Sequence, residues 1–306
     1  MPTRKLISFD WAMKRLLRSK ANFGILEGFL SELLREDVQI VEVLESESNR
    51  DTADDRSNRL DLKVRNRRGE LVLIEVQYER QHDYLSRMLY GSARTLVEHL
   101  DAGEPYADLV KVISVNILYF DLGHGEDYIY RGTTRFHGLH KHDELALSRA
   151  QRQLFPGREG THELFPEYYL IKVERFDDCA RDTLDEWVYF LKHEAIQDGF
   201  SAKGLREAKE KLDVLKLAPA ERAAYERWQD DLHLQASLVA SNYGLGKIEG
   251  REEGREEGRE EGRQEGRDEG REERTLEIAR AMKANGVAPS VIAQSTGLDH
   301  EVIAGL

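Results

Sequence analysis

The chain has 306 residues, of which 40% are hydrophobic, and it carries a formal net charge of −13. This length allows one large core with an appendage, or two domains. The single cysteine, Cys179, excludes an intramolecular disulfide, and the acidic balance argues against a protein that coats nucleic acid non-specifically, because that function requires a basic surface.

The start of the chain contains no apolar run long enough for a signal peptide or a membrane span, because Asp10, Lys14 and Arg15 interrupt it. We therefore expect a cytoplasmic protein that does not interact with membranes. Basic side chains gather in two segments: residues 1–20 hold six Lys or Arg against one Asp, and residues 50–68 hold seven against four acids. Such local clusters are compatible with binding of nucleic acid despite the overall charge.

Residues 9–34 repeat apolar side chains at helical spacing and predict two helices that are separated near residues 19–22. Residues 38–44 alternate as a strand does. The polar segment 45–58 that follows is typical of a loop.

Residues 60–65 and 71–77 alternate apolar and polar side chains with a period of two, and Gly69 lies in the turn between them. This pattern predicts a β-hairpin. Pairing about Arg68 makes one face wholly aliphatic through three opposed pairs: Leu60 with Val76, Leu62 with Ile74, and Val64 with Val72. A shift by one residue would turn these side chains to solvent, so the pattern favours this register.

The opposite face of the predicted hairpin carries Asp61 across from Glu75, with Gln77 pointing the same way. Two carboxylates that close repel each other unless a cation lies between them or one stays protonated. Oxygen ligands from two strands suit magnesium, and a magnesium ion that activates water and offsets phosphate charge is the chemistry of phosphodiester hydrolysis. The alternative is a surface hairpin whose charges are solvated.

Residues 83–100 predict a helix, and residues 109–120, rich in Val and Ile, predict a strand buried on both faces. Two short strands are expected at 128–136 and 168–173, followed by helices at 184–196, 205–215 and 220–243. His137, His140 and His142 lie between these two strands. They lack the second ligand cluster that a zinc site requires, so we interpret them as solvated loop histidines.

Residues 250–273 form a Gly-Arg-Glu-Glu repeat with glycine at every fourth position from Gly250 to Gly270. Glu252 and Arg255 are spaced for a helical ion pair, but each glycine costs about 1 kcal/mol in a helix relative to alanine. The repeat is therefore either a self-associating helix or a solvated linker. Residues 275–306 predict three short helices in a small tail, which is too short to fold without a partner.

Several of these segments resemble the PD-(D/E)XK nuclease superfamily, and most closely its transposase-like branch, the recombination-promoting nucleases. Asp61 followed by Glu75-Val76-Gln77 is similar to the Asp…Glu-x-Lys signature in the Glu-x-Gln form of that branch. Residues 9–17 resemble the opening helix of the branch, and residues 71–77 its Gly-Glu-Leu…Ile-Glu-x-Gln strand. Its next helix and strand are similar to the segment containing Tyr84, Arg87, Met88 and Tyr90 and to residues 109–120.

The resemblance implies a restriction-endonuclease-like α/β fold, with an αβββαβ core, a mixed central sheet flanked by helices, and a C-terminal helical region. We therefore predict four segments. They are a nuclease-like domain over residues 1–180, a helical subdomain over 181–245, the repeat as linker or helix over 246–274, and a small helical tail over 275–306.

The resemblance further implies a magnesium-dependent DNA endonuclease that promotes recombination or mobile-element exchange, with manganese or calcium as other possible ions. Asp61 and Glu75 are its expected metal ligands, together with a backbone carbonyl near Val76, and Glu75 is expected to orient the attacking water. Asp10 is implied as a third ligand. It is equally well explained as an acid that interacts favourably with the N-terminus of its helix.

Gln77 stands where the commonest form of the superfamily has lysine, and a glutamine cannot supply a charge or act as a base near neutral pH. Lys63, on the same face of the hairpin, or Lys14, on the opening helix, is expected to supply the missing cation. Arg87 and Tyr90 are candidate contacts to DNA phosphates, along with Lys14.

Two other functions stay open at this point. One is a non-catalytic DNA-binding or assembly protein derived from a nuclease, in which the repeat and tail mediate homo-oligomerisation. The other is an RNA-directed nuclease that uses the same ligands.

Overall fold

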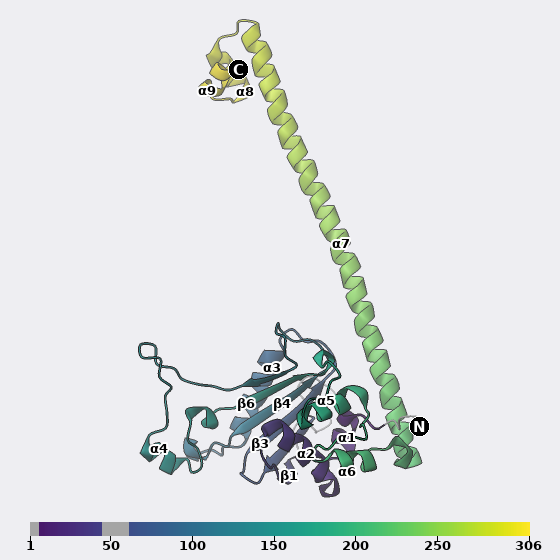
Figure 1. Ribbon diagram of the computed structural model, residues 1–306. Helices are drawn as coiled ribbons and strands as arrows, with labels where there is room; N and C mark the ends of the chain where they lie inside the picture. Colours follow the sequence, from purple (N-terminus) through teal and green to yellow (C-terminus); the bar gives the residue numbers. More distant parts are fainter. Residues whose placement is uncertain (1–5, 45–60) are drawn as a thin grey trace. The chain divides into compact units, whose positions relative to one another are not determined.

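The computed structural model describes residues 6–44 and 61–306 (Figure 1). Six strands form one mixed sheet in the order β1-β2-β3-β4-β6-β5. In chain order they are β1 (Ile40–Leu44), β2 (Leu62–Asn66), β3 (Leu71–Gln77), β4 (Val112–Leu118), β5 (Ile129–Gly132) and β6 (Glu167–Lys172). Strands β3, β4 and β6 run parallel to one another, and the remaining neighbours pair antiparallel.

The predicted hairpin is present as β2 and β3, and its register is confirmed, since Leu62 pairs with Ile74 and Val64 pairs with Val72. The partner expected for Val76, Leu60, lies outside the described residues, as does the predicted loop 45–58.

Four helices cover the aliphatic face of the sheet: α1 (Phe9–Arg15), α2 (Phe23–Leu34), α5 (Thr183–His193) and α6 (Leu205–Lys211). Their aromatic side chains pack edge to face, with ring centroids 5.2 Å apart for Phe9 and Phe29 and 6.0 Å apart for Phe9 and Trp187. Helix α1 begins at Phe9 because the Ser8 side chain accepts a hydrogen bond from the amide of Trp11. Its position against the sheet follows from this buried aromatic cluster.

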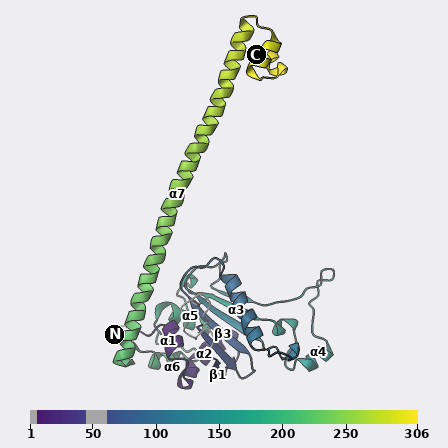
Figure 2. The same ribbon diagram turned by 180° about the vertical axis from the view of Figure 1, so that it is seen from behind.

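The opposite face of the sheet carries α3 (Tyr84–Glu98), which lies across the strands in Figure 2. Leu96 of α3 packs on Leu71, Leu73 and Val112. Tyr84 at its start packs with Leu118. Residues on this face of β2 and β3 therefore point toward α3.

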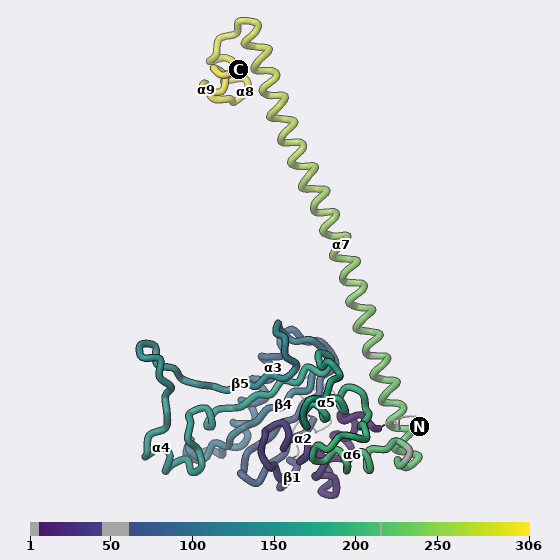
Figure 3. Tube along the Cα trace, in the orientation of Figure 1, coloured from purple at the N-terminus to yellow at the C-terminus, as the bar shows by residue number. Residues whose placement is uncertain are grey.

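The chain between β5 and β6 leaves the sheet and carries α4 (Arg149–Leu154), as the tube in Figure 3 shows. Phe136, Leu139 and Leu145 of this excursion are exposed. The described residues also form short 3-10 turns at Lys20–Asn22, Tyr106–Asp108, Thr161–Leu164, Val173–Arg175 and Val214–Lys216.

The chain divides into two compact units, Met1–Asp231 and Leu232–Leu306. Residues 181–231 fall within the first of these units. Trp187 of α5 and Ala208 of α6 are buried in the same core as the sheet. The four segments expected from the sequence, with the helical subdomain over residues 181–245, stay predictions.

Helix α7 (Pro219–Ala284) contains the whole glycine repeat, so the repeat is helical. Two short helices follow, α8 (Pro289–Thr296) and α9 (His300–Gly305). Ala279 of α7, Ile292 of α8 and Ile303 of α9 form a small common core. No helix among the described residues is both long and apolar enough to span a membrane.

Candidate active site

Asp61 is fixed beside Glu75 through the backbone of the neighbouring strand. Its Oδ2 accepts a hydrogen bond of 2.7 Å from the amide of Val76, directly after Glu75. The two carboxylates are close enough for Asp61 to raise the pKa of Glu75. The pair predicted from the hairpin pattern is therefore brought together at the end of β3 that carries Gln77.

Helix α1 brings a third carboxylate to the same place. The ammonium nitrogen of Lys14 lies 2.7 Å from Asp10 Oδ1 and 3.3 Å from Asp61 Oδ1. Although burial opposes its charged form, Asp61 and Asp10 together raise the pKa of Lys14. Asp10 therefore belongs to this cluster, and Lys14 links it to Asp61.

Two of the carboxylates are largely withdrawn from water, with Asp10 2% and Glu75 6% exposed. Burial raises the pKa of Asp10 to about 6, against the opposing effect of Lys14 and with a further increase from Asp61. Burial likewise raises the pKa of Glu75 to about 7, against the opposing effect of Arg87 and with a smaller increase from Asp61. Carboxylates perturbed by burial and by a neighbouring charge are typical of functional sites.

Each of these two buried acids is paired with one cation of the chain. Lys14 Nζ lies 2.7 Å from Asp10 Oδ1, and Arg87 Nη2 lies 2.5 Å from Glu75 Oε1. These ion pairs lower the pKa of each carboxyl but do not outweigh the effect of burial. The buried negative charge is therefore only partly compensated, and a further cation would stabilise it.

Carboxylate oxygens are hard ligands of the kind that divalent ions such as Mg²⁺ prefer. Within residues 6–44 and 61–306, no three His, Cys, Asp or Glu side chains form a group suited to hold a metal ion. Magnesium is commonly held by one or two carboxylates together with water and phosphate oxygens. Asp61 and Glu75 as metal ligands, Asp10 as a third ligand and the carbonyl near Val76 as a fourth stay predictions.

The remaining predicted residues are distributed as follows. Gln77 donates from Nε2 to the carbonyl of Glu79 at 3.3 Å. Lys63 points away from the acids, since its ammonium lies 3.3 Å from Glu98 Oε2 and its side chain is only 4% exposed. Tyr90 on α3 is 54% exposed and free to contact a ligand. Arg87 also donates to Gln81.

Three residues near the acids were not assigned a role from the sequence. Asn116 is paired with Glu75 in the β3–β4 ladder, and the hydroxyl of the buried Tyr84 donates to Asn116 Oδ1 at 3.0 Å. Burial, and then Glu75, raise the pKa of Tyr84. Arg18 donates from Nη2 to the carbonyl of Asp61 at 2.9 Å. Of these three residues, Asn116 could have been noticed in the sequence, because it is a polar residue inside an otherwise apolar predicted strand.

A mixed sheet flanked by helices, with carboxylates gathered where β2 begins and β3 ends, defines a nuclease-like α/β domain of restriction-endonuclease type. The family model described as PD-(D/E)XK nuclease family transposase matches residues 7–147, so this part of the chain is similar to that family. The resemblance inferred from the sequence is thereby confirmed. The match includes Asp10, Asp61, Glu75 and Arg87. No curated protein and no solved structure matches the chain.

Proposed function

We propose that the chain is a metal-dependent DNA endonuclease that hydrolyses phosphodiester bonds and promotes recombination or mobile-element exchange. The observation that carries this proposal is the group of carboxylates at the end of β3, in which Asp10 and Glu75 are buried beside Asp61 and keep raised pKa values although Lys14 and Arg87 pair with them. The similarity of residues 7–147 to the nuclease family supports the same class of chemistry.

Asp61 and Glu75 would hold the ion, which is magnesium or, in its place, manganese or calcium. Bound there, the ion would supply a positive charge that offsets the charge developing on the phosphate. Glu75 is positioned to orient an attacking water in line with the phosphorus. The amide of Val76 fixes Asp61 in the orientation that this arrangement requires.

Lys14 is the better candidate for the cation that Gln77 cannot supply. Its ammonium lies 3.3 Å from Asp61, and its side chain is 41% exposed, so it can also contact a bound phosphate. Lys63 is engaged with Glu98 and is almost fully buried. Gln77 itself would contribute a neutral amide that hydrogen-bonds water or phosphate.

A nicking assay on supercoiled plasmid tests the proposal. We expect the wild-type protein to nick DNA with Mg²⁺ and to lose this activity with a chelator or after Asp61→Ala. Asp198→Ala is the matched control, because Asp198 is a fully exposed carboxylate that pairs with Lys209. A labelled RNA of the same sequence in parallel reactions tests the RNA-directed alternative.

The non-catalytic alternative has one observation in its favour. Cations of the chain already neutralise the acids, since Arg87 faces Glu75 and Lys14 lies between Asp10 and Asp61. A calorimetric titration of the protein with Mn²⁺ separates the two functions. A nuclease is expected to bind Mn²⁺, and Asp61→Ala is expected to abolish this metal binding. A non-catalytic protein derived from a nuclease is expected to bind DNA but no Mn²⁺.

We also propose that the second unit mediates homo-oligomerisation. In α7, each glycine from Gly250 to Gly270 is preceded by an acid and followed by an arginine. Because successive helical residues are about 100° apart, the acids and the arginines flank the glycine row on opposite sides. A parallel second copy would therefore align arginines with acids across the row, and an antiparallel copy would align like charges.

Exposed apolar side chains on α7 before the repeat support this association. Leu234, Leu238, Leu245 and Ile248 are all more than half exposed and follow spacings of three, four and seven residues. Sedimentation of the full chain is expected to show an oligomer that Leu238→Asp with Leu245→Asp dissociates. A wild-type protein that sediments as a monomer at micromolar concentration contradicts this role.

A further inference from the structure

Three basic residues surround Asp121 just beyond the edge of the sheet. The carboxylate of Asp121 pairs with Lys172, at 3.3 Å, and with Arg175. Arg80 donates from Nη2 to the carbonyl of Asp121 at 3.4 Å. The cluster thus contains three basic side chains and one acidic side chain, although the overall charge of the protein is strongly negative.

This cluster lies at the same edge of the sheet as the carboxylates. Gln77, Leu118 and Lys172 are neighbours in the pairing of β3, β4 and β6. Arg80 and Asp121 each follow one of these residues by three positions, and Arg175 does the same beyond Lys172. Because the three strands are parallel, their continuations emerge together at this edge, next to Gln77.

The three cations differ in exposure and therefore in what they can do. Lys172 is 2% exposed, and its ammonium lies 4.9 Å from the centre of the Tyr130 ring, so it fixes Asp121 from the protein side. Arg175 is 52% exposed, and Arg80 is also exposed. Asp121 pairs with both Lys172 and Arg175, so the three cations exceed the one acid by two positive charges, and the exposed guanidinium groups of Arg80 and Arg175 present this charge to solvent.

Arg18, on the other side of Asp61 and Glu75 from Arg80, is also oriented by a backbone carbonyl. Arg18 donates to the carbonyl of Asp61, and its buried Nε has no hydrogen-bond partner among the described residues. Neither Arg18 nor Arg80 pairs with a carboxylate in the part of the chain that the structure describes. A backbone carbonyl orients a guanidinium without neutralising it, which leaves both the charge and the remaining donors for a ligand.

We propose that Arg18, Arg80 and Arg175 form a track that binds the phosphates of one nucleic-acid strand on both sides of Asp61 and Glu75. This inference rests on the proposed nuclease function and extends it to residues with no role so far. The planar guanidinium forks match phosphate oxygens with paired hydrogen bonds. The track also explains how an acidic protein binds a polyanion, since the positive charge is concentrated along one edge of the sheet.

The geometry sets the length of the bound segment. Neighbouring strands lie about 4.8 Å apart, so β3 and β6 are separated by roughly 10 Å. In a duplex, each strand carries one phosphate for about every 3.4 Å along the axis. Arg175, which follows β6, would therefore hold a phosphate about three nucleotides from the one positioned at Glu75, and Arg80, which follows β3, one closer to it.

Fluorescence anisotropy with a labelled 20-base-pair DNA duplex, in a chelator that prevents cleavage, tests the track. The variants are Arg80→Gln, Arg175→Gln and their combination in the full-length chain. Arg206→Gln is the control, because Arg206 is 95% exposed but lies beside Glu210 on α6. Arg80→Gln removes only one long hydrogen bond, so the fold is expected to persist, and thermal unfolding checks this.

We expect each single variant to bind DNA about 3- to 10-fold more weakly at 100 mM salt and to lower the salt slope by about 0.9. The double variant is expected to show the product of the single effects, and Arg206→Gln to bind as the wild type does. Arg175→Lys should restore only part of the affinity, because it keeps the charge without the fork. A single-stranded DNA and an RNA of the same sequence identify which backbone the track prefers.

Folded Arg80→Gln and Arg175→Gln proteins that bind with wild-type affinity and salt slope overturn the track. If the wild type also nicks plasmid, only the track is lost and the nuclease function stands. If the wild type binds DNA through these arginines but does not nick it with Mg²⁺, the track stands and the nuclease function fails.

Discussion

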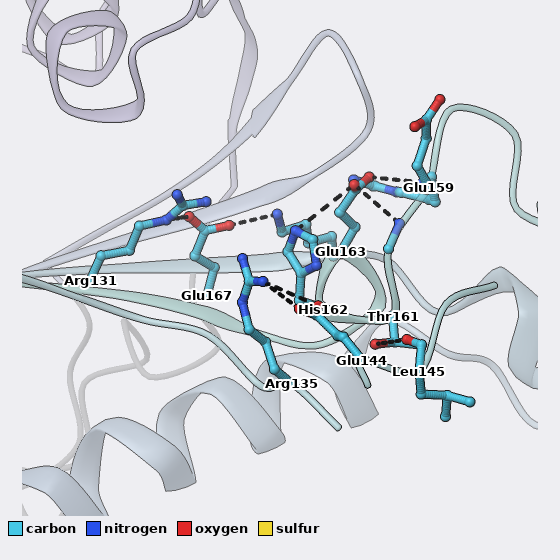
Figure 4. Close-up of polar contacts among 12 residues, drawn as sticks. Arg131, Arg135, Glu144, Leu145, Glu159, Thr161, His162, Glu163 and Glu167 are labelled. Carbon is cyan, nitrogen blue, oxygen red and sulfur yellow. Dashed lines mark hydrogen bonds and ion pairs between the residues drawn. The ribbon is translucent and has the colours of Figure 1, made fainter. Parts of the chain in front are cut away.

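The two ends of the central strands both bury carboxylates, but they treat them differently. At the start of β3 and β6, Glu70 and Glu167 are 2% and 4% exposed and are fully paired. Glu70 accepts hydrogen bonds from Asn66 and Arg158, both at 2.8 Å. Glu167 accepts from Lys111 at 2.7 Å and from Arg131 at 2.6 Å, the latter drawn in Figure 4.

At the other end, Asp10 and Glu75 are each paired with one cation, Lys14 and Arg87. Burial alone would raise the pKa of Glu167, but hydrogen bonds from Arg131, Lys111 and Tyr169 lower it to about 2. Burial raises the pKa of Glu75 to about 7 despite Arg87. Similar burial thus accompanies a lowered pKa at one end and a raised pKa at the other. This contrast fits the proposed function, in which the first end serves folding and the second binds an ion.

The largest expected effect comes from Glu75→Gln, which removes the charge but keeps the size of the side chain. Nicking of plasmid DNA with Mg²⁺ should fall by about 1,000-fold, equivalent to about 4 kcal/mol of lost transition-state stabilisation. The variant removes a buried charge but also takes the carboxylate away from Arg87, so nicking is compared per folded molecule after thermal unfolding has been measured. Full activity of this variant would remove Glu75 from the mechanism.

Glu167→Gln is the matched substitution at the other end. It leaves Lys111 and Arg131 without their carboxylate, so the free energy of unfolding should fall by about 3 kcal/mol. Denaturant unfolding measures this change. Nicking per folded molecule should equal that of the wild type, and a loss of activity as large as that of Glu75→Gln contradicts the division of roles.

The two ends should also respond oppositely to pH. The folded pKa of Glu167, about 2, lies below its ordinary value of 4.5, so its stabilisation is present above pH 4.5 and is lost as pH falls toward 2. The folded pKa of Glu75, about 7, lies above 4.5, so the metal-free protein should lose stability as pH rises from 4.5 through 7.

Thermal unfolding in a chelator checks both slopes. In a plot of melting temperature against pH, Glu167→Gln should reduce the slope below pH 4.5. Glu75→Gln should reduce the slope above pH 5. Adding Mg²⁺ at pH 8 should raise the melting temperature of the wild type by about 2–4 °C and leave Glu75→Gln unchanged. A wild-type stability profile that is flat between pH 5 and 8 contradicts the raised pKa of Glu75.

Much of the fold was predictable because local patterns determine it. The alternation in residues 60–65 and 71–77 allowed only one register that buries the aliphatic side chains, and the strands pair in that register. The pairing of Asp61 with Glu75 followed from it. The approach of Asp10 was not predictable from spacing, because it depends on the packing of Phe9 against Phe29 and Trp187, far away in the sequence.

The helical state of the glycine repeat was also beyond the sequence pattern. Glycine disfavours a helix at six positions from Gly250 to Gly270, whereas ion pairs three residues apart, such as that between Glu260 and Arg263 at 3.4 Å, favour it. These opposing contributions are similar in size, so their balance could not be decided from propensities.

Substitutions of Lys14 and Lys63 have the smallest expected effects on nicking, and they distinguish which lysine supplies the cation near the acids. Alternation in β2 predicted Lys63 on the same face as Asp61, but not the direction of its long side chain, which turns to Glu98. Lys14→Met should lower nicking about 10-fold, because it removes the exposed cation beside Asp61, while Lys63→Met should leave nicking of the folded protein unchanged.

The same two variants separate catalysis from metal affinity. Lys14 competes with an ion for Asp10 and Asp61, so Lys14→Met should bind Mn²⁺ more tightly in calorimetry even as cleavage slows. Lys63→Met should change neither quantity, although it should reduce stability by leaving Glu98 unpaired on that side. If Lys63→Met instead slows cleavage and Lys14→Met does not, the cation that replaces the missing lysine comes from the hairpin, and Glu98 must release Lys63 during the reaction.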